Sequence, residues 1–200
     1  MSAPVQVRTP LEEAQLKGLK AGDLCEITGV LFTARDAAHK RFLEAIRKGE
    51  PLPVDLRGQI LYYVGPTPAK AGQVIGSAGP TTAVRMDSYL ETMLARTGLK
   101  ATIGKGHRTR GAVEAMKRHG AVYFAALGGA GALLSKHIKK AEVVAYEDLG
   151  TEACRRLEVE RFPVYCINDL AGNDFYRQSK AKWQTWKKPK AVEAAGEGLD

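Results

Sequence analysis

Short apolar segments alternate along this chain with amphipathic segments, and this alternation restricts the possible folds more than any other feature. Residues 121–126, AVYFAA, form an unbroken apolar run of strand length, as expected for a strand that is buried on both faces. Similar patterns predict further strands at residues 24–33, 59–64, 101–103, 141–147 and 162–167.

Amphipathic segments between these strands predict three helices. Residues 35–49 and 85–98 repeat apolar side chains at helical spacing, and residues 110–118 place Val113 and Met116 on one side. A glycine stands at or just beyond the end of each segment, where helices commonly terminate. Strands that alternate with helices indicate an α/β domain in which helices cover a layered sheet.

Residues 48–80 depart from this alternation, because they are rich in proline and glycine. We expect a short hairpin or ordered loops over the sheet there. With 200 residues, 44% of them hydrophobic, the chain is long enough for one real core. We therefore expect a single domain over residues 1–179 and a basic tail that contains tryptophan over residues 180–200.

The formal net charge of +8 fits a nucleic-acid surface, an anionic substrate or a basic patch that faces a partner. The most basic stretch is residues 180–190, KAKWQTWKKPK, where lysines alternate with two tryptophans. This mixture suits nucleic-acid phosphates and base stacking. A tail whose tryptophans pack on the body is the favoured interpretation, so we expect no nucleic-acid partner.

No apolar run approaches the roughly 20 residues that a membrane-spanning helix needs. The N-terminal residues MSAPVQVRTPLEEAQ also lack the basic-then-apolar order of a signal peptide. We expect no membrane association and a cytoplasmic location.

The three cysteines, Cys25, Cys154 and Cys166, lie far apart and form no C-x-x-C pair. Three thiolates are in principle enough to hold three irons of a 4Fe-4S cluster. Each cysteine, however, lies in an apolar, strand-like context, where a free cysteine usually acts as a small buried hydrophobic residue. The packing interpretation is therefore favoured.

Three predicted strand-to-helix junctions each carry a cation: Arg35, Arg85 and Lys105. Ligands of open α/β sheets bind outside the carboxyl ends of the strands, where helix N-termini add positive potential. A cation there is disfavoured by about 0.3–1 kcal/mol unless an anion lies near it. The repeated pattern indicates one anion site, and solvated surface cations are the alternative.

The stretch GPTTAVRMD, residues 79–87, has both a structural and a catalytic interpretation. Gly79 and Pro80 can form a turn, and either Thr82 or Asp87 can cap the following helix. The neighbouring glycine-rich segments complete neither a P-loop nor a dinucleotide motif. The four histidines are scattered, so surface or packing roles are favoured for them.

Several of these segments together resemble one family. From LKAGD, which begins at Leu19, to GNDFY, which ends at Tyr176, the chain contains TARDAAHK, GPTPAKAGQVIGSAGPTTAVRMD, IGKG and GGAGALL in this order. The set resembles the β subunit, or the equivalent C-terminal domain, of class I iron-sulfur fumarate hydratases and their tartrate dehydratase relatives.

The resemblance implies a swivelling β/β/α domain and a hydro-lyase that interconverts fumarate and malate. It implies a hetero-oligomer with an α subunit, whose own cysteines ligate a 4Fe-4S cluster, so this chain supplies no metal ligand. Tartrate or mesaconate is the alternative substrate, and a basic nucleic-acid-binding module is the remote alternative function. Carried over by position, the catalytic residue is Thr81, and the carboxylate-binding residues are Arg35, Arg85 and Lys105.

Overall fold

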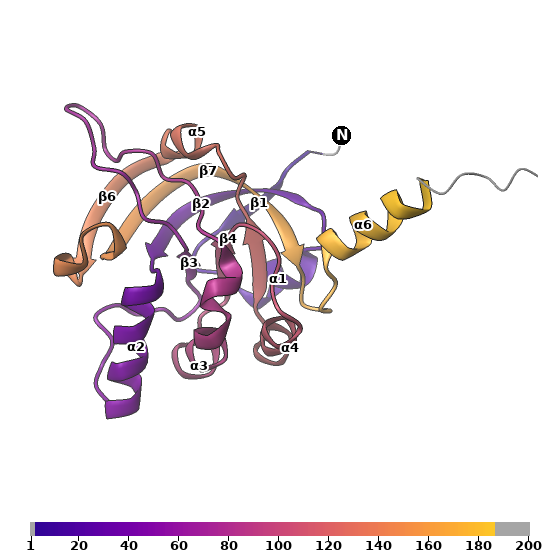
Figure 1. Cartoon of the computed structure of the whole chain (residues 1–200), viewed down its shortest axis with the longest axis horizontal. Coiled ribbons are helices and arrows are strands. Elements are labelled where there is room, and N and C mark those ends of the chain that lie inside the picture. The colour runs from indigo at the N-terminus through magenta and orange to yellow at the C-terminus, as the bar shows by residue number, and fades with distance from the viewer. Residues whose placement is uncertain (1–2, 187–200) are drawn as a thin grey trace, which may run out of the picture.

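Four parallel strands and the helices between them form the larger layer of the fold (Figure 1). The structure is a computed structural model that describes residues 3–186. The parallel strands are β2 (Leu24–Thr33), β3 (Ile60–Tyr62), β4 (Ala101–Gly104) and β5 (Val122–Ala125). The connecting helices are α2 (Asp36–Lys48), α3 (Asp87–Thr97) and α4 (Arg110–His119).

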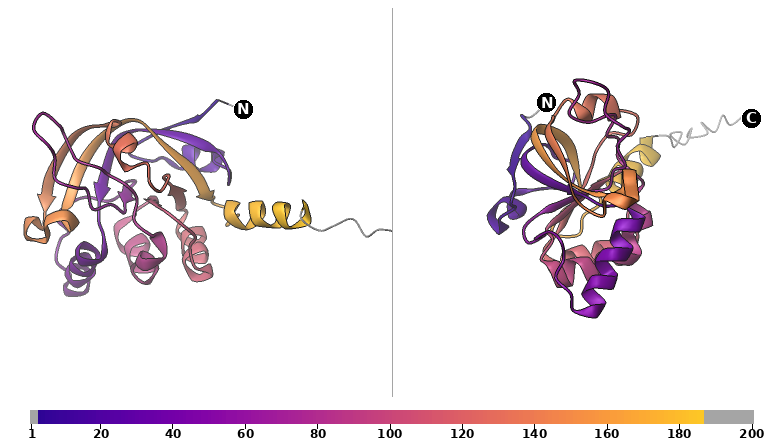
Figure 2. Two further views of the ribbon diagram at one scale, coloured as in Figure 1. Left: turned by 45° about the horizontal axis from the view of Figure 1, so that its top comes forward. Right: turned by 90° about the vertical axis from the view of Figure 1, so that its left-hand side faces the viewer.

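These three helices cover one face of the sheet, where they lie side by side (Figures 1 and 2). The order of the four parallel strands in space follows their order along the chain. Since crossovers between parallel strands are right-handed, successive crossovers in one direction place all helices on the same side. The carboxyl ends of β2 to β5 consequently meet along a single edge, close to the N-termini of the helices.

The remaining elements flank this layer. β1 (Val5–Arg8) runs parallel to β2, and α1 (Glu13–Gly18) connects the two. The 3-10 turn η1 (Ala83–Met86) precedes α3, and α5 (Gly131–Ser135) follows β5. The antiparallel strands β6 (Ile138–Ala145) and β7 (Cys154–Asn168) are joined by the 3-10 segment η2 (Glu147–Glu152), and α6 (Phe175–Trp186) projects from the body (Figure 1).

The long strand β7 closes the sheet into a barrel. One edge of β7 pairs with β2, whereas its other edge pairs first with β6 and then with β5. The ring therefore runs through β2, β3, β4, β5 and β7 and returns to β2, as the curvature in Figure 2 shows. The predicted α/β class with helices on a sheet is confirmed. The closure of the sheet into a barrel was not predicted. The swivelling β/β/α assignment stays a prediction.

Apolar side chains on the two faces of the sheet form two separate cores. In β5, Val122 and Phe124 belong to the core inside the barrel, whereas Tyr123 and Ala125 belong to the core under the helices. All four residues are buried, which confirms the strand predicted within residues 121–126. Burial on both faces explains why this strand is a continuous apolar run.

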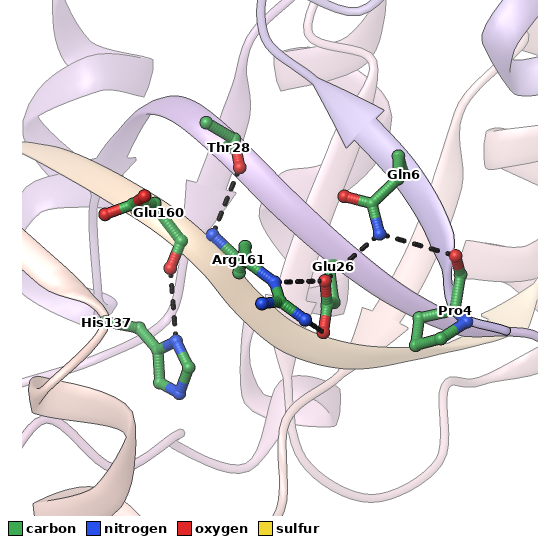
Figure 3. Close-up of polar contacts among 7 residues, drawn as sticks. All are labelled: Pro4, Gln6, Glu26, Thr28, His137, Glu160 and Arg161. Carbon is green, nitrogen blue, oxygen red and sulfur yellow. Dashed lines mark hydrogen bonds and ion pairs between the residues drawn. The ribbon is translucent and has the colours of Figure 1, made fainter.

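An ion pair on the outside of the barrel joins β2 and β7 beside a shift in their register (Figure 3). Arg161 donates through Nε and Nη2 to the Glu26 carboxylate, at 2.8 and 3.1 Å, and its backbone N–H bonds Thr28 Oγ1 at 3.1 Å. Gln6 of β1 donates to the same carboxylate at 3.0 Å. One carboxylate thus connects β1, β2 and β7.

The predicted helices are confirmed, and α2, α3 and α4 each end at a glycine in the left-handed conformation, with φ between 61 and 71°. Arg85 lies in η1 and precedes the α-helical part of the second predicted helix. The short elements β1, α1 and α5 were not predicted, because four to six residues are too few to show a reliable period. The strand expected at residues 162–167 covers only the C-terminal part of β7.

The proline- and glycine-rich segment contains β3 and ordered loops. No hairpin forms within described residues 48–80, because β3 pairs in parallel with β2 and β4. Thr67 and Ser77 close the base of the loop after β3, through Thr67 N–H to Ser77 C=O at 3.0 Å and Ser77 N–H to Thr67 Oγ1 at 2.8 Å.

At the C-terminal end, α6 runs across the expected boundary between residues 179 and 180. The expected tail from residue 187 onward lies outside the described residues, so the division into domain and tail stays a prediction. Within residues 3–186, no helix combines the length and the apolar character that crossing a membrane requires.

Candidate functional site

The candidate site lies along the carboxyl edge of the parallel strands. Arg35 follows β2 and immediately precedes α2, and Lys105 follows β4. Thr81 and Arg85 lie on the segment that leads into α3. The carboxyl ends of parallel strands, beside helix N-termini, are where α/β folds commonly bind ligands.

Backbone hydrogen bonds place Thr81 between the ends of β3 and β4. The Thr81 N–H donates to the Tyr63 carbonyl at 2.7 Å, and the Thr81 carbonyl accepts from the Lys105 N–H at 3.0 Å. Pro80 forms an antiparallel bridge with Val64. Thr81 and Lys105 are therefore neighbours whose relative position is determined by the main chain.

Gly104, which precedes Lys105, allows this close approach. A Cβ at Gly104 would lie 2.9 Å from the Cβ of Ala83 and 3.2 Å from the Thr81 carbonyl oxygen. The 2.9 Å contact is closer than real Cβ atoms approach, so a side chain at Gly104, the first glycine of IGKG, would push the Thr81–Ala83 segment away. The sequence shows the glycine but does not show which segment packs against it.

Arg35 is held close to the protein surface by three contacts. Its Nη2 lies 3.3 Å from Glu152 Oε1, in a pair whose side chains are 22% and 23% exposed. Its guanidinium passes over Gly65, where an added Cβ would fall 2.5 Å from Nη1. The Arg35 carbonyl accepts a hydrogen bond from the ring of His39 at 2.8 Å. The backbone and the guanidinium of Arg35 are therefore each held by a contact.

Arg85 is more exposed and pairs with a carboxylate on the neighbouring helix. Its Nη2 donates to Asp36 Oδ2 at 2.8 Å, and its side chain is 51% exposed. Asp36 directly follows Arg35 in the chain. Its pair with Arg85 therefore brings the Arg85 guanidinium to the first turn of α2, next to Arg35. Arg35 thus lies on the β2 side of the segment that contains Thr81 and Arg85, and Lys105 lies on its β4 side.

The capping interpretation of the GPTTAVRMD stretch is wrong. Thr82 precedes η1 but makes no side-chain capping bond. Asp87 instead accepts a hydrogen bond at Oδ2 from the Thr109 N–H, at 2.7 Å, at the start of α4. Thr109 is the residue that caps α4, because its Oγ1 accepts from the Ala112 N–H at 3.3 Å.

Arg108 is a buried cation behind the Lys105 loop that sequence reasoning did not single out. Its Nε lies 2.6 Å from Asp87 Oδ1, its Nη1 donates to Thr102 Oγ1 at 3.1 Å, and its side chain has no solvent exposure. The guanidinium also stacks over the Tyr123 ring, 5.0 Å from the centroid. Nothing in GHRTR distinguishes this buried arginine from a solvated one, because its partners come from other elements.

A hollow of about 590 Å³ opens beside Lys105. Thr82 and Lys105 contribute to its rim, but most of the lining is apolar and includes Leu127 and Tyr176. Arg35 and Arg85 do not line it. The hollow consequently suits an apolar group better than a carboxylate.

The cysteines do not have the properties of cluster ligands. Cys25 and Cys166 lie in the barrel core and Cys154 lies in the core under the helices, which confirms the packing interpretation. Burial raises the pKa of the Cys25 and Cys154 thiols to about 12 and raises the pKa of Cys166 as well. Iron-sulfur ligation needs thiolates, and residues 3–186 contain no cluster of three or more potential metal ligands.

The chain is similar to several known proteins. A family model described as "Fumarase C-terminus" matches residues 1–179. Fumarate hydratase 2 of Leishmania major is 38% identical over 183 residues, which are 90% of this chain and 32% of the relative. The aerobic class I fumarate hydratase of Escherichia coli K12 is 38% identical over 177 residues, which are 87% of this chain and 32% of the relative.

A relative of different size is the putative L(+)-tartrate dehydratase subunit beta of Methanocaldococcus jannaschii. It is 36% identical over 177 residues, which are 86% of this chain and 91% of the relative. This chain thus spans about a third of the fumarate hydratases that it matches and nearly all of the separate β subunit. The match of the family model and the identity over most of the chain show that the chain belongs to the fumarase C-terminus family.

Proposed function

We propose that this chain is the β subunit of a two-subunit hydro-lyase that reversibly hydrates fumarate to malate. The observation that carries the proposal is the carboxyl edge of the sheet, to which three segments of a fumarase C-terminus chain contribute Arg35, Thr81 with Arg85, and Lys105. Thr81 is the proposed catalytic residue, and the three cations are the proposed carboxylate-binding residues.

The chemistry explains why such a reaction needs several cations. Removal of the proton beside a carboxylate of malate creates an enolate-like centre with additional negative charge. Positioned cations stabilise that charge as it develops in the transition state. Arginine suits this task because its planar guanidinium can bind a carboxylate through two parallel hydrogen bonds.

Two carboxylates of the chain already pair with two of these cations. Glu152 contacts Arg35 through Nη2, and Asp36 contacts Arg85 through Nη2. Since a guanidinium has five N–H donors, each arginine can keep this pair and still donate to a substrate. Lys105 forms no salt bridge with a described residue. Among the three cations it is therefore the one whose positive charge no carboxylate within residues 3–186 balances.

Thr81 would move the proton between substrate and enzyme. A threonine hydroxyl is a very weak base near neutral pH, so it needs nearby cations or an acid-base partner. Lys105 is the candidate cation, because its backbone N–H bonds the Thr81 carbonyl and makes the two residues neighbours. We propose that the α subunit contributes a further acid-base group, an aspartate by family resemblance.

The proposed partner is an α subunit that ligates a 4Fe-4S cluster. The three buried cysteines of this chain do not fit as ligands, so the cluster would have to be held by the partner. The separate β subunit among the relatives supports an arrangement of two chains.

Tartrate is the second candidate substrate. The relative with nearly the same length as this chain is named as a putative L(+)-tartrate dehydratase subunit. Arginine and lysine side chains recognise the carboxylates that fumarate, mesaconate and tartrate share. They do not by themselves discriminate a methyl or hydroxyl substituent.

Reconstitution tests the proposed function. The purified chain is mixed anaerobically with its candidate α partner, iron and sulfide, and fumarate, mesaconate and tartrate are assayed side by side. We expect fumarate hydration by the mixture and none by either chain alone. Turnover of tartrate alone would assign the second candidate, and a stable, cluster-loaded complex without turnover of any of the three acids would contradict the proposal.

A further inference from the structure

Glu152 connects Arg35 to the first turn of α2. Its Oε2 accepts the backbone N–H of Ala37 at 2.8 Å, and its Oε1 lies 3.3 Å from Arg35 Nη2. One carboxylate therefore satisfies an unpaired donor of the helix N-terminus and contacts the cation that precedes the helix. Glu152 comes from η2, between β6 and β7, far from Arg35 in the sequence.

A second contact holds η2 against the same helix. Arg41 of α2 binds the Asp148 carboxylate of η2 through both terminal guanidinium nitrogens, Nη1 and Nη2. The Arg41 contact lies farther along α2 than the contact of Glu152 with Ala37. Two carboxylates of one six-residue segment thus attach η2 to α2, and only Glu152 also reaches a proposed substrate-binding residue.

The Arg35 side chain is long and can adopt many rotamers, so a partner such as Glu152 is needed to hold its guanidinium in one position. An arginine side chain loses rotamer entropy when it becomes ordered. If this loss has occurred before the substrate arrives, it no longer weakens substrate binding. Gly65 leaves room for the guanidinium, but only Glu152 pairs with its charge among the described residues.

We propose that Glu152 is a positioning residue that holds the Arg35 guanidinium at the carboxyl edge of the sheet for a substrate carboxylate. The inference rests on the proposed function as far as the substrate is concerned. With this role, η2, which connects β6 to β7, contributes a residue to the site at the ends of the parallel strands.

The first test measures the order of Arg35 in the full chain without a partner. The variant Glu152→Gln keeps an oxygen for the Ala37 N–H and removes the charge that faces Arg35. Asp148→Asn is the matched control, because it makes the same charge change in the same segment away from Arg35. The probe is the Arg35 Nε–Hε signal in nitrogen-15 NMR spectra, assigned by its loss in Arg35→Lys.

We expect this proton to exchange slowly with water in the original chain, because Arg35 Nε is buried. Glu152→Gln should accelerate the exchange about tenfold or more, since the guanidinium loses its ionic partner. Asp148→Asn should leave the rate unchanged, and all three proteins should unfold at similar temperatures. An unchanged exchange rate in Glu152→Gln would overturn the positioning role.

The second test uses the reconstituted complex with fumarate. Glu152→Gln should lower kcat/KM about tenfold, mainly through a higher KM, because a carboxylate-binding group is less well oriented in both ground and transition state. Asp148→Asn should stay within about twofold of the original complex. A kcat/KM for Glu152→Gln equal to or above the original value contradicts the inference but not the proposed function. Absence of turnover in the original complex contradicts the proposed function, and the exchange measurement then decides the role of Glu152.

Discussion

At the scale of single residues, the main chain rather than the side chain positions Thr81. Its N–H and carbonyl are both used, in bonds to Tyr63 and Lys105. The side chain is therefore not needed to keep the segment in place. Removal of the hydroxyl should separate the chemical contribution of Thr81 from its structural contribution.

The variant Thr81→Ala should lower kcat of the reconstituted complex by about 10²–10⁴, the range for loss of a proton-transfer group. The free energy of unfolding should change by less than about 1 kcal/mol, because both backbone bonds remain. Steady-state kinetics and urea unfolding measure the two effects. Thr82→Ala is the control from the same segment, and near-normal turnover of Thr81→Ala would remove the residue from the mechanism.

At the scale of elements, α2 packs on the sheet through a buried histidine close to the site. The His39 ring stacks on Tyr89 of α3, with centroids 5.4 Å apart, and meets Tyr63 beyond the end of β3 edge-on at 5.5 Å. His39 is 1% exposed. Burial lowers the pKa of His39 to about 4, so the ring is neutral at pH 7 and can donate from Nδ1 to the Arg35 carbonyl.

This depressed pKa predicts a pH-dependent stability. Between pH 6.5 and pH 4 the unfolded chain binds a proton at His39 and the folded chain does not, so acidification favours unfolding. The wild-type free energy of unfolding should fall by about 3 kcal/mol more than that of His39→Phe between pH 7 and pH 4. Urea unfolding at a series of pH values measures this difference. Equal losses in the two proteins would show that His39 titrates normally.

At the scale of the whole molecule, β7 makes one cooperative unit from two halves of the chain. It pairs with β2 on one edge and with β6 and β5 on the other. Phe162 of β7 is fully buried inside the barrel, and its ring lies 5.4 Å from that of Tyr62 on β3. Loss of this ring should affect both halves, because β7 closes the barrel between β2 and β5.

The variant Phe162→Ala should lower the free energy of unfolding by about 3–5 kcal/mol, the usual cost of deleting a buried phenylalanine ring. Val143→Ala on β6, where the valine is 41% exposed, should change it by less than about 0.5 kcal/mol. Urea titrations should give coincident transitions by near-ultraviolet circular dichroism, which reports the packing of buried tyrosines such as Tyr62, and by far-ultraviolet circular dichroism, which reports the helices. Separate transitions for the two signals would show that tertiary packing is lost apart from the helices, so the chain would not be one cooperative unit.

The sequence by itself determined the class of the fold and the ends of the main helices. Helical and strand periods are local, so α2, α3 and α4 and the strands between them could be predicted from their own residues. The left-handed glycine after each helix is equally local. Family resemblance, rather than any periodicity, selected Thr81 from the two adjacent threonines.

Only the tertiary structure decided how the chain closes and what the site residues contact. The ladder of β7 with β2, the pair of Arg35 with Glu152 and the burial of Arg108 all join segments from different elements. Charge and hydrogen-bonding capacity can be read from a residue, but its partner cannot, because many carboxylates could satisfy the same arginine. The fold makes that selection, since packing brings Glu152 within reach of Arg35.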